Sequence, residues 1–127
     1  MLQRPNKKMG ELVLNLLNSA TVIHLAHLKT RSYAAHKALN EYYDAIPDLA
    51  DSLAEEYQGA TLTLLTYPSS TDMKSPLSTE ELCTYLMDLK DQVTREQTAC
   101  TYSEIVNLMD NIKSLINSTC YKLKFLS

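Results

Sequence analysis

Apolar residues recur every three or four positions through four separate stretches of this chain, and this spacing limits the possible folds more than any other feature. At about 100° per residue, such spacing places the apolar side chains on one stripe of an α-helix. The pattern predicts helices over residues 9–28, 33–58, 79–98 and 102–124. Four amphipathic helices bury their stripes most readily against one another, so we expect a single all-α domain over residues 1–127, built as a four-helix bundle.

Turn residues and caps agree with this helical interpretation. The chain has only two glycines and four prolines, which is few for a β-rich domain. Ser78 and Glu81 have the spacing of a capping box at the start of the third helix. Thr101 and Glu104 have the same spacing, and they predict the start of the fourth helix.

The second helix contains a proline and is followed by a long connection. Pro47 interrupts the helix, but the apolar stripe keeps its phase on both sides, so we predict one kinked helix rather than two. Ser32 is the predicted N-cap of this helix, and Gly59 is the predicted C′ residue just beyond its end at Gln58. The composition of residues 59–77 predicts a long connection, and the rest of the chain offers no obvious strand with which this segment could pair.

Charge and cysteine content restrict the class of protein. The net charge of −3 argues against a dedicated DNA-binding protein, and Arg4, Lys7 and Lys8 make only a small basic arm. The chain has no apolar run of about 18 residues or more, so we expect no membrane span, and its start does not resemble a signal peptide. Three cysteines without a Cys-x-x-Cys pair predict reduced thiols in a cytoplasmic protein.

All three histidines lie within residues 22–36, VIHLAHLKTRSYAAH. The spacing places His24 and His27 on the apolar stripe of the first helix, whereas His36 belongs to the second helix. A neutral imidazole can be buried only if its ring nitrogens find partners. A metal ion, or carboxylates from another helix, would supply those partners.

A ridge of polar residues borders the apolar stripe of the second helix. It follows His36 at offsets of 4, 8, 12, 15 and 19 and consists of Asn40, Asp44, Asp48, Asp51 and Glu55. Histidine and carboxylate ligands together suit iron, manganese or zinc. The residues alone leave a second interpretation open, in which the ridge is a solvated face and the histidines are hydrogen-bonded core or dimer-seam residues.

The segment HLAHLKTRSYAAHKALNEYYDAIPDLADSLAEEYQG resembles the helix A to helix B signature of Dps-like ferritins. His24 and His36 are twelve residues apart, as the two histidines of that signature are. Asp51 and Glu55 follow His36 by fifteen and nineteen residues and stand in an Asp-x-x-Ala-Glu run, as in that family. The sequence motif Thr-x-Ser-Tyr-Ala-x-His also resembles that of small ferritin-like proteins of large tailed phages.

The resemblance implies a ferritin-like bundle that runs up-down-down-up, with the long connection between the second and third helices. It also implies a homo-oligomer, from a dimer to a dodecamer, with a non-haem iron ferroxidase centre between subunits. Zinc or manganese would be substitutes for the iron. The protein would lie in the cytoplasm or, for a phage-encoded chain, in the host cytoplasm or the virion.

The implied ligands come from two chains. One chain supplies histidines, from among His24, His27 and His36, and its two-fold partner supplies Asp51 and Glu55. Asn40, Asp44 and Asp48 would orient these ligands or replace one of them.

The chain departs from the family at several of these positions. Asn40 stands where the family has an Asp, Leu25 where it has a Trp, and Glu56 where it has an Arg. If the loop between the first two helices is shortened, His27 rather than His24 takes the ligand position. An alternative hypothesis keeps the ferritin-like fold but gives the chain a structural or interaction role, such as that of a phage accessory protein, without metal chemistry.

Overall fold

The computed structural model describes residues 3–127, with side chains from Asn6 onward. Four helices make up this part of the chain: α1 (Gln3–Lys29), α2 (Tyr33–Thr61), α3 (Thr79–Ala99) and α4 (Ser103–Phe125). No strand occurs within these residues, so the all-α, four-helix prediction is confirmed. The first helix begins six residues before its predicted start, because the polar residues ahead of the apolar stripe continue the helix.

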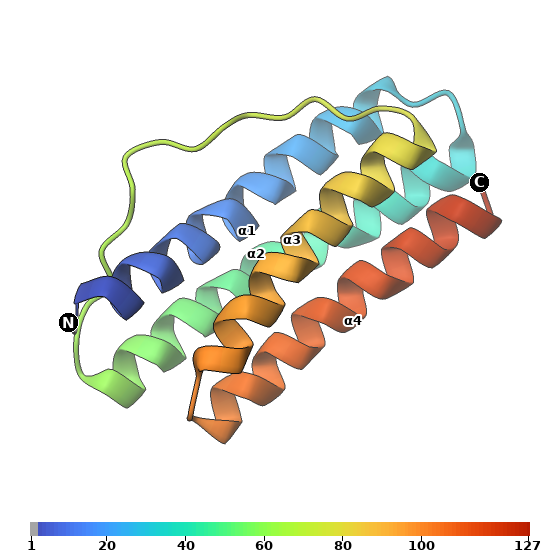
Figure 1. Ribbon diagram of the computed structural model, residues 1–127. Coiled ribbons are helices and arrows are strands. Elements are labelled where there is room, and N and C mark those ends of the chain that lie inside the picture. Colours follow the sequence, from blue (N-terminus) through green and yellow to red (C-terminus); the bar gives the residue numbers. More distant parts are fainter. Residues whose placement is uncertain (1–2) are drawn as a thin grey trace.

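The helices are arranged as a square in which chain neighbours are not always spatial neighbours. α1 packs on α2, α2 on α4, α4 on α3, and α3 on α1, whereas α1 and α4 lie on one diagonal and α2 and α3 on the other. Figure 1 shows α1 and α4 running in one direction and α2 and α3 in the opposite one. The bundle therefore runs up-down-down-up.

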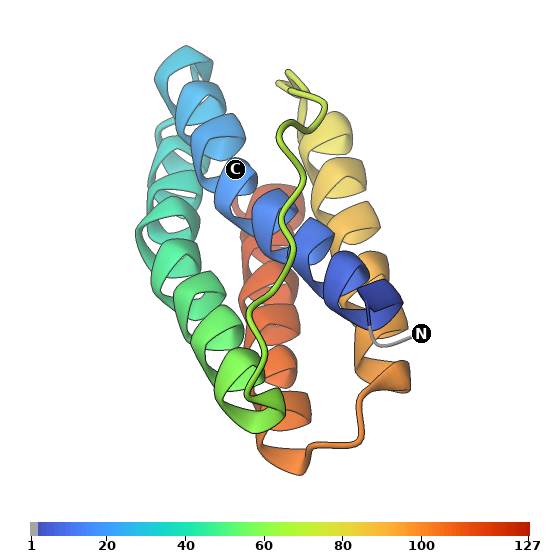
Figure 2. The ribbon, with the colours of Figure 1, turned by 90° about the vertical axis from the view of Figure 1, so that its left-hand side faces the viewer.

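The connection between α2 and α3 makes this topology possible. It leaves α2 at one end of the bundle, runs along the outside of α1, and reaches the opposite end, where α3 begins (Figures 1 and 2). Thr71 Oγ1 donates to Asn15 Oδ1 at 2.7 Å, and Lys29 Nζ donates to Ser75 Oγ at 3.0 Å. These side chains attach the connection to α1 along its length.

One glycine explains why the connection can lie so close to α1. A Cβ atom added to Gly10 would lie 2.0 Å from the backbone oxygen of Thr66. Any side chain at this position would therefore collide with the backbone of the connection.

Each helix turns its apolar stripe into one common core. The fully buried large side chains of this core have the expected spacing, and they are Leu12, Leu16, Ile23, Leu39, Tyr42, Ile46, Leu53, Leu82, Leu86, Ile105, Met109 and Ile112. Burial of one such side chain is worth about 1.5–3 kcal/mol, so the four stripes together dominate the stability of the bundle.

α1 contains a long apolar segment, within residues Asn6–Lys29. In the described part of the chain it is the one helix that is long and apolar enough to cross a membrane, with a mean hydropathy of 1.2. Half of the apolar window is buried inside the bundle. Packing in the core therefore accounts for this composition.

The second helix passes Pro47 without a break, which confirms the prediction of one helix. Its predicted N-cap is also confirmed, because Ser32 Oγ accepts a hydrogen bond from the backbone N–H of Ala35 at 3.1 Å. The predicted end before Gly59 is wrong. Ala60 packs against the core and carries the helix onward, and the chain leaves it at Leu62, whose φ of 52° is left-handed.

The two predicted capping boxes have different outcomes. Ser78 and Glu81 form the box in full, and backbone N–H bonds from Ser78 and Leu77 hold the pKa of Glu81 below its ordinary value. The box at Thr101 is wrong, because Tyr102 is the N-cap of α4 and makes no side-chain capping bond. A side chain of α3 contacts the first turn of α4 instead, since Gln97 Nε2 donates to the backbone oxygen of Val106 at 2.9 Å.

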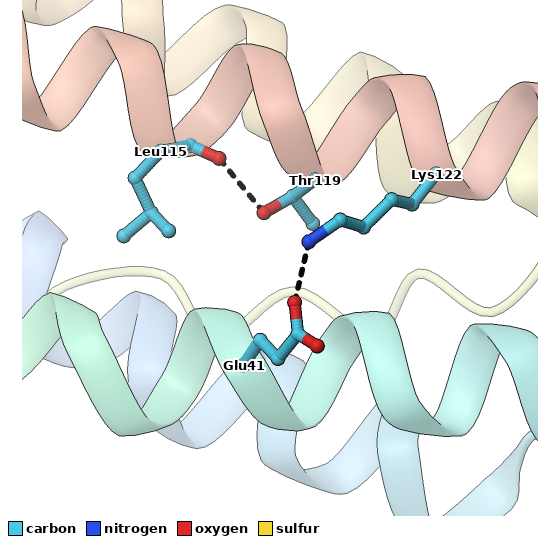
Figure 3. A network of polar contacts seen from close by, with 4 residues as sticks. All are labelled: Glu41, Leu115, Thr119 and Lys122. Carbon is cyan, nitrogen blue, oxygen red and sulfur yellow. Dashed lines mark hydrogen bonds and ion pairs between the residues drawn. The ribbon is translucent and has the colours of Figure 1, made fainter.

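A polar contact on the surface joins α2 to α4 (Figure 3). The Lys122 ammonium makes an ion pair with the Glu41 carboxylate. The hydrogen bond from Lys122, together with its charge, lowers the pKa of Glu41. About one turn before Lys122 on α4, Thr119 Oγ1 donates to the backbone oxygen of Leu115 at 2.8 Å.

Candidate metal-binding site

A short loop determines which histidines meet. α1 ends at Lys29 and α2 begins at Tyr33, so three residues separate the two helices. Thr30 N donates to the backbone oxygen of Ala26 at 2.9 Å and closes the last turn of α1. This tight hairpin brings His27, in the last turn of α1, opposite His36, in the first turn of α2.

The two imidazoles exchange hydrogen bonds with each other's backbone. His27 Nδ1 lies 2.7 Å from the carbonyl oxygen of His36, and His36 Nδ1 lies 2.9 Å from the carbonyl oxygen of His27. The rings stack with centroids 3.6 Å apart and planes inclined by 20°. Because a carbonyl oxygen only accepts, each Nδ1 carries a proton, and in the neutral ring each Nε2 keeps its lone pair.

His24 lies beside this pair but makes none of its carbonyl bonds, and its ring centroid is 5.8 Å from that of His27. Its side chain is exposed and stacks on the Tyr43 ring, with centroids 3.9 Å apart. Its predicted place on the apolar stripe is therefore wrong, since three residues of helix rotate it by about 60° away from His27. His27 is buried, as predicted, with 6% of its surface exposed, and His36 is half-buried.

A chain of polar side chains on α2 leads away from His27. Tyr43 OH lies 3.4 Å from His27 Nε2 and donates to Asn40 Oδ1 at 2.7 Å. Asn40 Nδ2 in turn donates to Asp44 Oδ2 at 2.6 Å. Tyr43 gives its only hydroxyl proton to Asn40, and the proton of neutral His27 is on Nδ1, so no hydrogen bond joins Asp44 to the imidazole through this chain.

Sequence reasoning missed Tyr43 as part of this site. Tyr43 is half-buried and contacts both histidines of α1. Its position three residues after Asn40 and seven after His36 places all three on one face of α2, and this spacing could have indicated its role.

The predicted carboxylate ligands lie elsewhere on the same helix. Asp48, Asp51 and Glu55 are exposed, and Asp51 follows His36 by fifteen residues, which is about 22 Å of helix. Asp51 raises the pKa of Glu55, first by accepting a hydrogen bond from the protonated Glu55 carboxyl and then by its negative charge. Within residues 3–127 of one chain, no three His, Cys, Asp or Glu side chains are grouped closely enough to hold a metal ion.

The described geometry is that of a helical-bundle protein with an imidazole pair at one hairpin and a carboxylate pair far along the neighbouring helix. Residues 27–123 match the Family of unknown function (DUF5856), so the chain belongs to that family. This range contains every predicted ligand except His24.

One curated relative supports a phage connection. The chain is 30% identical over 109 residues to the "Uncharacterized 14.6 kDa protein in mobD-ri intergenic region" of Enterobacteria phage T4. The alignment covers 85% of this chain and 81% of the phage protein. No solved structure gives a significant match.

Proposed function

We propose that this protein is a ferritin-like, Dps-like homo-oligomer that binds iron between two subunits and oxidises Fe(II) there. Nε2 of His27 and Nε2 of His36 are the nitrogen ligands. The oxygen ligands are Asp51 and Glu55 of the partner subunit. Zinc and manganese, which accept the same donor set, are expected to bind as substitutes.

The reciprocal bonds between His27 and His36 carry the proposal. A metal-bound histidine nearly always donates its other ring N–H to a carbonyl or carboxylate, which fixes the tautomer and the ring orientation. Both Nδ1 atoms are committed to carbonyl oxygens in this way, at 2.7 and 2.9 Å. The two Nε2 atoms are the ring nitrogens that make no bond to a carbonyl, and Nε2 of His27 lies 3.4 Å from Tyr43 OH.

The position of the carboxylates supports a site shared between subunits. Asp51 and Glu55 are exposed, and about 22 Å of helix separates Asp51 from His36. Asp51 raises the pKa of Glu55, in part because its negative charge disfavours a second carboxylate beside it. A cation brought by a partner chain would neutralise this repulsion, and carboxylate oxygens favour Fe(III) over Fe(II).

The topology also supports the ferritin-like part of the proposal. An up-down-down-up bundle with a long connection between its second and third helices is the arrangement that the resemblance implies. The connection is attached to α1 by Thr71 and Ser75, on the side of the bundle away from the α2–α4 contact.

Metal binding by the purified protein, without a polyhistidine tag, tests this proposal. Anaerobic Co(II) or Fe(II) titration should show binding by the wild type and by His24→Ala, and loss of binding by His36→Ala and by Asp51→Asn. Fe(II) oxidation in air, followed in the near ultraviolet, should likewise be retained by the wild type and by His24→Ala and lost by the other two variants. A wild type without bound metal, or a His36→Ala variant that binds as well as the wild type, would overturn the proposal.

A second function is favoured by the same hairpin. The His36 ring bonds to a carbonyl in the last turn of α1, where backbone oxygens lack helical partners. Among the described side chains, no buried polar atom lacks a hydrogen-bond partner, so the hairpin is complete without a metal. In this alternative the chain is a structural or interaction protein, such as a phage accessory protein.

Assembly state separates the two functions. Iron storage requires a closed shell, such as the dodecamer that the resemblance implies, whereas an interaction role is compatible with a monomer or a dimer. Sedimentation or light scattering at micromolar concentration decides between them. A monomer that binds no metal would favour the interaction role.

A further inference from the structure

Two cysteines far apart in the sequence meet between α3 and α4. Cys83 Sγ lies 3.9 Å from the backbone oxygen of Cys120, 37 residues further along the chain. The Cys83 thiol also lies near enough to the Cys120 thiol to raise the pKa of Cys120, after the larger effect of burial. Neither the histidine hairpin nor the carboxylate pair involves these residues.

We propose that Cys83 and Cys120 form a redox-active dithiol site, in which hydrogen peroxide converts the two thiols into a reversible disulfide between α3 and α4. Cys83 Sγ already reaches the backbone of Cys120, across two antiparallel helices that pack on each other. A disulfide between the two residues would therefore join helices that are already in contact. The proposal is independent of metal binding.

Exposure assigns different roles to the two sulfur atoms. Cys120 has 6% of its surface exposed, and burial, followed by the nearby Cys83, raises the pKa of its thiol to about 12. Cys83 is half-buried and is the thiol that peroxide can reach. Cys83 is therefore the attacking residue and Cys120 the resolving residue.

The reaction is balanced in two steps. The Cys83 sulfur attacks one peroxide oxygen and breaks the O–O bond, which gives a sulfenic acid and one water molecule. The Cys120 sulfur then attacks the Cys83 sulfur and displaces the hydroxyl group, which leaves as a second water molecule with the Cys120 proton. The two thiols lose two electrons in total, and the peroxide gains them.

A positive charge assists the second step. Lys90 of α3 acts on Cys120 with its charge and lowers the pKa of this thiol, although burial has the larger effect. The ammonium group favours the transient thiolate that the attack requires.

The third cysteine provides a matched control. Cys100 Sγ donates to the backbone oxygen of Tyr102 at 3.8 Å, in the turn between α3 and α4. It is half-buried, like Cys83, but it follows Cys83 by seventeen residues, which is about 25 Å of α3 and turn. A difference in peroxide reactivity between Cys83 and Cys100 would therefore result from the nearby Cys120 and not from a difference in exposure.

The experiment uses the full-length chain with Cys100→Ser, reduced and then treated with hydrogen peroxide. We expect loss of both remaining thiols, a mass lower by two hydrogens, and a cross-linked peptide containing Cys83 and Cys120. Dithiothreitol should restore both thiols. The oxidised form should have the higher Tm, because the disulfide closes a long loop in the unfolded chain.

Variants that lack one of the two cysteines test the order of the two steps, because they cannot form the disulfide. In Cys120→Ala, dimedone should trap a sulfenic acid at Cys83, whereas Cys83→Ala should leave Cys120 largely unmodified at the same peroxide concentration. Persistence of both thiols in Cys100→Ser, stepwise addition of oxygen without a cross-link, or disulfide-linked dimers as the main product would overturn the proposal.

Discussion

His27 and His36 each donate a hydrogen bond to the other's backbone carbonyl oxygen, and their rings stack 3.6 Å apart. The two helices of the hairpin are thus joined by side chains whose Nε2 atoms make no bond to a carbonyl. This one relationship underlies both the metal-binding proposal and the structural alternative. Its contribution to stability can be measured without any metal.

Removal of either histidine should destabilise the metal-free protein. We expect His27→Ala and His36→Ala each to lower the free energy of unfolding by about 1–3 kcal/mol, because each removes a stacked ring and a hydrogen bond. The double variant should cost less than the sum, since both changes remove the same contact. Urea unfolding with chelator present measures all three. Exposed His24 is the control, and His24→Ala should cost less than either.

The two glycines should respond in opposite directions to the same substitution. Gly59→Ala should stabilise the protein by about 0.5–1 kcal/mol, because Gly59 lies inside α2 with open space around it. Gly10→Ala should destabilise the protein despite the same gain in helix propensity, because its Cβ would lie 2.0 Å from the backbone oxygen of Thr66. Thermal unfolding compares them. Stabilisation by both would mean that the connection does not lie against α1.

A buried pair of hydroxyls should show an asymmetric cost. Ser19 Oγ donates to the Leu16 carbonyl at 2.6 Å, so the Tyr42 hydroxyl, 2.8 Å away, donates to Ser19. Ser19→Ala leaves a buried tyrosine donor without a partner and should cost about 1–3 kcal/mol. Tyr42→Phe leaves Ser19 still bonded to Leu16 and should cost less. The reverse order in urea unfolding would contradict this hydrogen-bond assignment.

The same tyrosine should make the bundle sensitive to alkali. Burial raises the pKa of Tyr42 above its ordinary value of 10.0. Its contribution to stability is fully present below pH 10.0 and is lost as the pH rises toward the folded-state pKa, because only the unfolded chain then releases the proton. The Tm of Tyr42→Phe should therefore fall less steeply above this pH than that of the wild type. Equal slopes would contradict the burial of this hydroxyl in the folded state.

The Glu41–Lys122 ion pair should contribute little to the free energy of unfolding, and this contribution should be lost at acidic pH. Lys122 lowers the pKa of Glu41, so the contribution is present above the ordinary pKa of 4.5 and is lost as the pH falls through the folded-state pKa. Glu41 is exposed and Lys122 is partly exposed, which limits the value to about 0–1 kcal/mol and makes it sensitive to salt. Glu41→Gln in low and high salt measures it, with Glu56→Gln as the unpaired control in the described part of the chain. A salt-independent loss would contradict an ion-pair origin.

Local rules predicted the helices well, and contacts between distant residues account for what they missed. Helical periodicity found all four helices, and the Ser78 box marked the start of α3, because both depend on neighbours within one turn. The choice of His27 over His24 depended on the length of a three-residue loop. Gly10 and the Cys83–Cys120 contact depend on segments 56 and 37 residues apart, which no local pattern describes.

Complementation between two inactive variants tests the central claim, a metal site shared by two chains, most directly. His36→Ala lacks a nitrogen ligand, and the Asp51→Asn, Glu55→Gln double variant lacks the oxygen ligands, so neither should bind Co(II) alone. Unfolding and refolding the two together forms mixed dimers in which one of the two sites has all of its ligands. We predict that Co(II) binding returns in the mixture, and a mixture that binds no more metal than its separate components would contradict the shared site.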